Sequence, residues 1–183
     1  NGSYELACRL VDAAKAAGAD CVKFQTFRAE ELTSVHAEKA AYQKVNMGGD
    51  STQIEMLRKL ELTKSEFENL KAYCVKTDID FLSTPFDLES IVFLDGLGVP
   101  FWKIPSGEVT NLPYLLALAK TKKPVVMSTG MCELEEIRAA VKSLTDKGTP
   151  EITLLQCNTE YPTPYGDVNL RAIQTLRKEF GLK

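Results

Sequence analysis

The chain has 183 residues, of which 44% are hydrophobic and 26% are charged, and its formal net charge is −3. A chain of this length can bury a sizeable core, and its composition is that of a globular protein. The small negative charge argues against nucleic acid as a partner, and no apolar run approaches the ~20 residues that span a bilayer, so we expect no membrane partner either.

Helical and strand patterns alternate along the chain. Apolar spacings of three and four predict a helix over about residues 4–17, and a strand over 20–27 follows Gly18. The polar stretch from Arg28 to Thr52 shows weak periodicity and contains the loop signal NMGGD. Strands and helices then alternate, as helix 64–76, strand 79–85, helix 86–98, strand 100–108, helix 111–120, strand 123–130, helix 132–148, strand 152–164 and helix 167–180.

Five strands, nearly all followed by a helix, predict parallel βα units. The segments FLS, VVM and ITLL are apolar on both faces, which is typical of a sheet covered by helices. A closed eight-stranded barrel usually takes ~250 residues. We therefore expect an α/β fold of the TIM-type (β/α)8 class, present in residues 1–183 as an incomplete barrel of about strands two to six.

The cysteines predict reduced, buried thiols rather than a disulfide framework. Their number is odd and no two form a CxxC pair, so we expect core residues of an intracellular protein with a cytoplasmic location. The single histidine, His36, lies in a polar stretch and is expected to be solvated. These residues and spacings predict no zinc cluster.

Polar side chains follow every predicted strand. In a parallel barrel the strand ends gather on one face, where active sites are built. This places eight candidate residues together, namely Lys23, Gln25, Thr84, Lys103, Ser106, Glu108, Ser128 and Tyr161.

Two lysines on one face predict an anionic ligand. Lys103 lies between Trp102 and Ile104 in an apolar strand, and a buried ammonium is costly unless it is paired. The alternative is that each lysine pairs with a carboxylate such as Glu108 or Asp87. The turns at residues 106–107 and 128–130 carry hydroxyls and backbone N–H groups that suit phosphate oxygens.

The segment around Tyr161 can be interpreted in two ways. Two prolines stiffen YPTPY, so it is either a rigid connector to the last helix or a wall for a sugar ring, with Tyr161 offering its face or hydroxyl.

Seven blocks of this sequence resemble the sialic acid synthase family, which includes N-acetylneuraminate, legionaminate and pseudaminate synthases. The blocks occur in order over almost the whole chain, and KIPSGE together with NTEYPTP is the most specific combination. The blocks are GADCVKFQTF, QIEMLRKLEL, FLSTPFD, WKIPSGE, NLPYL, VVMSTGM and LLQCNTEYPTPYGDVNL.

The resemblance implies a (β/α) barrel followed by an antifreeze-like domain that lies outside this segment. It implies condensation of phosphoenolpyruvate with an N-acetylmannosamine-type sugar to give a sialic acid and phosphate, assisted by Mn²⁺ or Mg²⁺, in a homodimer. Phosphoenolpyruvate would be held by Lys23, Thr84, Lys103, Ser106 and Ser128. Gln25, Glu108 and Tyr161 match positions near the sugar, with Glu108 as the candidate catalytic residue, and Asn46 is a further candidate for sugar contact.

The family resemblance places the metal ligands outside this segment, so no metal ligand is assigned within it. The segment alone is therefore expected to be inactive. NTEYPTP and AEKAAYQ fit the neuraminate and legionaminate branches better than the pseudaminate branch.

Three other functions stay open. A Schiff-base aldolase on the same fold would use Lys23 or Lys103 as its nucleophile. A phosphoenolpyruvate-dependent synthase acting on a sugar phosphate would need further basic residues. The third alternative is an inactive fragment that only binds ligands.

Overall fold

A computed structural model describes residues 2–34, 37 and 52–182. The described chain contains five strands and divides into two compact units, residues 1–97 and 98–183. Each unit holds one parallel sheet, with order β1-β2 in the first unit and β3-β4-β5 in the second. The predictions at His36 and Asn46 lie outside the described residues.

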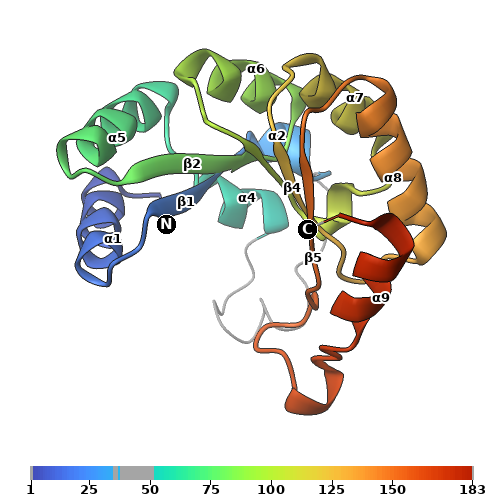
Figure 1. The fold of residues 1–183 in the computed structure, drawn as a ribbon. Coiled ribbons are helices and arrows are strands. Elements are labelled where there is room, and N and C mark those ends of the chain that lie inside the picture. The colour runs from blue at the N-terminus through green and yellow to red at the C-terminus, as the bar shows by residue number, and fades with distance from the viewer. Residues whose placement is uncertain (1, 35–36, 38–51, 183) are drawn as a thin grey trace. The chain divides into compact units, whose positions relative to one another are not determined.

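The first unit is built on two parallel strands. Its elements are α1 (Tyr4–Ala16), β1 (Cys21–Thr26), α2 (Ala29–Leu32), α4 (Gln53–Arg58), α5 (Lys64–Lys76), β2 (Asp80–Pro85) and α6 (Leu88–Leu97). Helices α1 and α5 contact each other, α1 packs on β1 and α5 packs on β2, so the pair lies beside the sheet (Figure 1). The rings of Phe24 and Phe81 stack between neighbouring strands with centroids 6.0 Å apart.

The second unit repeats the strand–helix pattern three times. Its elements are β3 (Trp102–Ile104), the 3-10 helix η1 (Ser106–Glu108), α7 (Leu112–Lys120), β4 (Val125–Ser128), α8 (Leu134–Asp146), β5 (Ile152–Leu155), the 3-10 helix η2 (Tyr165–Asp167) and α9 (Ala172–Phe180). Trp102 pairs with Val125, which pairs with Ile152, so the three strands start in register. Helices α7 and α8 pack against each other beside the strands (Figure 1).

Local sequence explains where several helices start. Thr63 begins α5 with a capping box: its hydroxyl accepts the Glu66 N–H at 3.2 Å, and the Glu66 carboxylate accepts the Thr63 N–H at 2.7 Å. Asn111 caps α7 by accepting the Tyr114 N–H at 3.3 Å, and Pro113 follows within the first turn, where its missing N–H costs nothing.

Some predicted boundaries were wrong. The strand predicted over 100–108 ends at Ile104, because Pro105 cannot donate to a strand ladder and residues 106–108 turn into η1. The last helix begins at Ala172 rather than 167, after η2 and a positive φ of 45° at Asn169. Two short helices, α2 and α4, were not predicted, because each is too short to show helical periodicity.

The expected burial of the strands is confirmed for β2 and only in part for β5. Residues 81–85 of β2 are all buried, whereas Leu155 at the end of β5 is 37% exposed. Among the described residues β5 pairs only with β4, so it forms an edge of its sheet.

Candidate functional site

In the first unit, three of the candidate residues share one face of the sheet. Gln25 pairs in register with Thr84, and Lys23 pairs with Leu82 one step earlier. Phe24 points to the opposite face, toward Phe81. Alternation along β1 therefore places the exposed Lys23 and Gln25 beside the buried Thr84, as the sequence predicts.

The hydroxyl of Thr84 is buried and makes no hydrogen bond within the described residues. It is 2% exposed, and its Oγ1 has no hydrogen-bond partner among the described residues. A buried polar atom without a partner costs ~1–3 kcal/mol, so such atoms mark candidate ligand contacts. The hydroxyls of the neighbouring Thr26 and Ser83 instead satisfy each other at 2.7 Å.

Asp87, one of the two carboxylates considered as a lysine partner, has a different role. Its carboxylate accepts the backbone N–H of Arg28 at 2.9 Å, the N–H of Ser90 at 2.6 Å and the Ser90 hydroxyl at 2.8 Å. These bonds anchor the start of α6 and the chain after β1.

In the second unit, Lys103 and Ser128 meet across neighbouring strands. The Lys103 ammonium donates to Ser128 Oγ at 2.6 Å and to the carbonyl oxygen of Ile104 at 2.7 Å. Lys103 is half-buried, whereas its neighbours Trp102 and Ile104 are fully buried. The arrangement sets one positive charge and one buried hydroxyl at the carboxyl ends of β3 and β4.

The two donor-rich turns of this unit also meet. The backbone N–H of Gly130 donates to Ser106 Oγ at 2.8 Å. A Cβ at residue 130 would lie 3.0 Å from the Cys157 carbonyl oxygen, 3.1 Å from Ser106 Oγ and 3.2 Å from Thr159 Cγ2. Glycine is therefore required for the turn after β4 to approach Ser106 this closely.

Cys157 is a site residue that the sequence did not reveal. Its Sγ lies 3.5 Å from Ser106 Oγ, although the cysteines were predicted to be core residues. Burial alone would raise the pKa of this thiol, but hydrogen bonds from the Ser106 and Ser128 hydroxyls and the nearby N–H groups of Gly130 and Thr129 bring it below that of an ordinary cysteine. The only available signal was its position just after β5.

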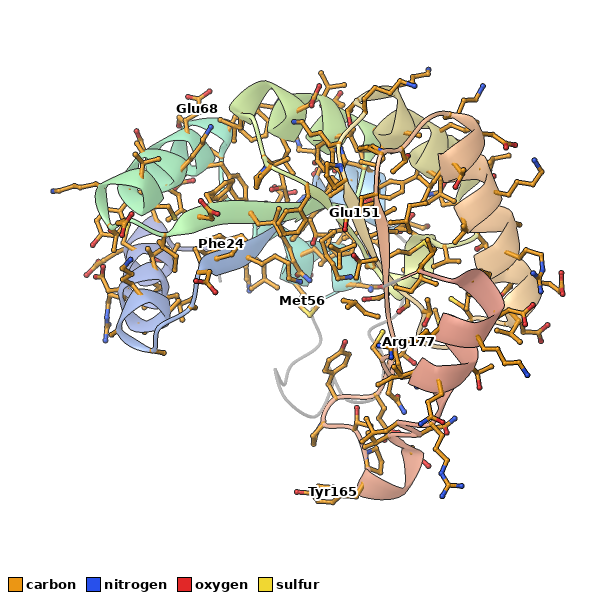
Figure 2. The ribbon with its side chains drawn as sticks, viewed as in Figure 1. Phe24, Met56, Glu68, Glu151, Tyr165 and Arg177 are labelled. Carbon is orange, nitrogen blue, oxygen red and sulfur yellow. The ribbon has the colours of Figure 1, made fainter. Side chains whose placement is uncertain are left out.

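Glu108 and Tyr161 take no part in the contacts described above for Lys103, Ser106 and Cys157. The Glu108 carboxylate accepts the Asn111 side-chain N–H at 2.7 Å, so the α7 cap also orients Glu108. Tyr161 is 81% exposed, and the nearby Tyr165 is fully exposed with its ring pointing outward (Figure 2). No hydrogen bond joins Tyr161 to the cluster within the described part of the chain.

The cluster formed by Lys103, Ser106, Ser128, Gly130 and Cys157 can bind an anion. It combines one ammonium and two hydroxyls: Lys103 lies at hydrogen-bond distance from Ser128, and Ser106 lies at hydrogen-bond distance from Gly130 and Cys157. In residues 2–34, 37 and 52–182, no three His, Cys, Asp or Glu side chains come together as a metal would require. The same part of the chain has no helix long and apolar enough to cross a membrane.

Known proteins resemble this chain along its whole length. The model of the NeuB family matches residues 10–183. The chain is 47% identical over 184 residues to an N,N'-diacetyllegionaminic acid synthase of Campylobacter jejuni, and the alignment covers 100% of this chain and 55% of that protein. It is 48% identical over 186 residues to the synthase of the same name from Legionella pneumophila, and that alignment covers 100% of this chain and 52% of the Legionella protein.

A solved structure has the same fold. It is an N-acetylneuraminic acid (sialic acid) synthetase from Leptospira borgpetersenii in complex with citrate, with a TM-score of 0.84 and 31% identity over 99% of this chain and 58% of that one. The chain thus spans about half the length of the curated relatives it matches.

Proposed function

Because the chain belongs to the NeuB family, we propose that it is part of a synthase that condenses phosphoenolpyruvate with an N-acetylmannosamine-type sugar. The products are a nonulosonic acid and phosphate. The observation that supports this most is the anion-binding cluster at the ends of β3, β4 and β5. Phosphoenolpyruvate carries a carboxylate and a phosphate, and Lys103, Ser106 and Ser128 offer one charge and two hydroxyls for one of them.

In the first unit, we assign Lys23 and Thr84 to the same substrate. Lys23 adds a second cation, and the unpartnered hydroxyl of Thr84 gains a hydrogen-bond partner when an anionic oxygen binds.

Gln25, Tyr161 and Glu108 are proposed to act on the sugar. Gln25 lies beside Thr84 in the sheet, and the exposed Tyr161 is free to pack its ring on a sugar. Glu108 is held by Asn111 and would orient the sugar or carry a proton.

The chemistry needs both substrates to be held together. The enol carbon of phosphoenolpyruvate attacks the aldehyde carbon of the open-chain sugar, which forms the C–C bond and leaves positive character at the carbon that bears the phosphate. Water adds there, and the tetrahedral intermediate loses phosphate. The lysines and hydroxyls supply proximity and charge complementarity for these steps.

A divalent cation, Mn²⁺ or Mg²⁺, is also proposed for the whole enzyme, where it would polarise the aldehyde. The described residues form no ligand set for it, so none of the roles above depends on it.

The domain organisation follows from the same family. We propose that the five strands are strands two to six of a (β/α)8 barrel, and that the whole protein also carries an antifreeze-like domain and forms a homodimer in the cytoplasm. The relatives' greater length and the high TM-score to the synthetase support a partial barrel within a longer protein. No role in binding nucleic acid or membranes is proposed.

For the acceptor sugar, the 47% and 48% identical relatives are both named N,N'-diacetyllegionaminic acid synthases. We therefore propose a 2,4-diacetamido-6-deoxy relative of N-acetylmannosamine as the first sugar to test, with N-acetylmannosamine as the second.

The test is phosphate release by the full-length parent protein with phosphoenolpyruvate, Mn²⁺ and each sugar. We expect release only when sugar and metal are both present. Borohydride with pyruvate should leave no adduct on Lys23 or Lys103. Absence of release with either sugar from a folded protein, or a lysine adduct, would contradict the synthase and favour the aldolase.

A further inference from the structure

The proposed function leaves one group of the anion-binding cluster without a role, the thiol of Cys157. It follows the third strand of the second unit, and the Ser106 hydroxyl lies 3.5 Å from its sulfur. The donors and acceptors around the sulfur determine the directions of its hydrogen bonds.

Ser106 gives the first direction. Its oxygen already accepts the Gly130 N–H at 2.8 Å, so its own hydrogen is available for Cys157 Sγ, 3.5 Å away. The thiol hydrogen points elsewhere, to the carbonyl oxygen of Leu155 at 3.7 Å. The bonds therefore run from Gly130 to Ser106, then to Cys157 and on to Leu155.

Ser128 also acts on the thiol. Its oxygen accepts the Lys103 ammonium at 2.6 Å, and hydrogen bonding by its hydroxyl helps to lower the pKa of Cys157. The Ser106 hydroxyl has only one hydrogen, so it cannot serve the sulfur and a bound anion at the same time.

We propose that Cys157 is a positioning residue of the anion site, whose sulfur holds the Ser106 hydrogen when the site is empty and releases it when an anion binds. A bound anion and a Cys157 thiolate then exclude each other, because both need the same Ser106 donor and both carry negative charge at the same place. This inference rests on the proposed function, since it takes phosphoenolpyruvate as the anion.

The charges around the sulfur favour such a competition. Cys132, in the turn after β4, is a titratable neighbour of Cys157, and it also interacts with Glu136 of α8. Glu108 is turned to Asn111. Donation to the sulfur lowers the pKa of Cys157, whereas burial and then Glu136 raise the pKa of Cys132.

Cys132, in the turn after β4, is a matched control for Cys157. Its Sγ lies 3.3 Å from the Gly130 carbonyl oxygen and 3.6 Å from the Ser106 carbonyl oxygen. Cys132 therefore contacts the backbone carbonyl oxygens of Gly130 and Ser106, but it does not accept the hydrogen of the Ser106 hydroxyl.

The first experiment labels the full-length protein with iodoacetamide and measures each cysteine by peptide mass spectrometry. The thiolate displaces iodide from the reagent carbon and forms a thioether, so the labelling rate reports the thiolate. Phosphoenolpyruvate at ten times its dissociation constant should slow labelling of Cys157 by roughly tenfold and leave Cys132 unchanged. Equal protection of both thiols, or none at Cys157, would overturn the proposal.

The second experiment measures phosphoenolpyruvate affinity by calorimetry from about pH 6 to about pH 9.5 in the parent protein and in Cys157→Ser. A group with a lowered pKa ionises earlier as pH rises, so parent affinity should fall by about tenfold per pH unit above the Cys157 pKa. Cys157→Ser keeps an acceptor that does not ionise, so it should lack this fall.

The two outcomes separate this inference from the proposed function. Parallel pH profiles for the parent protein and Cys157→Ser would overturn the role of Cys157 while leaving the synthase intact. A parent protein that binds no phosphoenolpyruvate at any pH would contradict the proposed function, and this inference with it.

Discussion

Lys103 is the residue whose charge matters most to the anion-binding cluster. It is half-buried between two fully buried side chains and donates to Ser128 Oγ at 2.6 Å. Hydrogen bonds that involve a charged group contribute ~1.5–3 kcal/mol, about twice the value for neutral ones. Lys103→Ala in the full-length enzyme is therefore expected to weaken phosphoenolpyruvate binding by roughly 10- to 100-fold and sugar binding by far less.

The control for this change is another lysine of the same unit. Lys142 is exposed and pairs with Asp146 four residues along α8. Exposed pairs contribute little, so Lys142→Ala should leave both affinities unchanged in the same calorimetric titration. Equal loss of phosphoenolpyruvate and sugar affinity in Lys103→Ala would contradict its assignment.

Residue-scale prediction from the sequence was limited by tertiary contacts. Alternation along a strand was enough to place Lys23 and Gln25 on one face and to set Lys103 apart from its apolar neighbours. Cys157 could not be recognised, because its role depends on Ser106, 51 positions earlier in the chain. The close approach of Gly130 to Ser106 was invisible for the same reason.

At the scale of elements, capping residues explain why the longer helices were predicted well. The helix predicted over 64–76 matches α5 at both ends, because the Thr63 and Glu66 box marks its start in the sequence. Helices α2 and α4 have no such length or periodicity, and β3 is shortened by Pro105. Short elements are fixed by packing rather than by local pattern.

The capping box of α5 gives a prediction at this scale. Thr63→Ala removes one acceptor and should cost about 1 kcal/mol, which corresponds to roughly fivefold faster hydrogen exchange in the first turn of α5. Bonds from the Thr63 N–H and hydroxyl lower the pKa of Glu66. The box therefore stabilises above the usual glutamate pKa and is lost as pH falls through the lowered pKa, so the effect should shrink in acid.

Thr63→Ser keeps the hydroxyl and is the control, and the box of α8, formed by Glu133 and Glu136, should exchange at an unchanged rate. Faster exchange throughout both helices would instead indicate global destabilisation.

At the scale of the whole molecule, the main feature is the unpaired edges of the two sheets in the part of the chain that the structure describes. Among the described residues β1 pairs only with β2, and β5 only with β4, so each leaves one row of backbone N–H and C=O groups without a strand partner. Open edges favour association between chains. The family relatives are about twice as long, and we have proposed a closed barrel for the whole protein.

A polypeptide of residues 1–183 alone should therefore behave differently from the full-length parent. We expect it to self-associate in sedimentation velocity and to release no phosphate from phosphoenolpyruvate and sugar, because the edges stay open and the described residues form no metal ligand set. Charged substitutions on β5, such as Leu155→Lys at the 37% exposed end of the edge strand, should reduce the association without restoring activity. A monomeric, active polypeptide would show instead that these residues carry a complete site, and would contradict the proposed partial barrel.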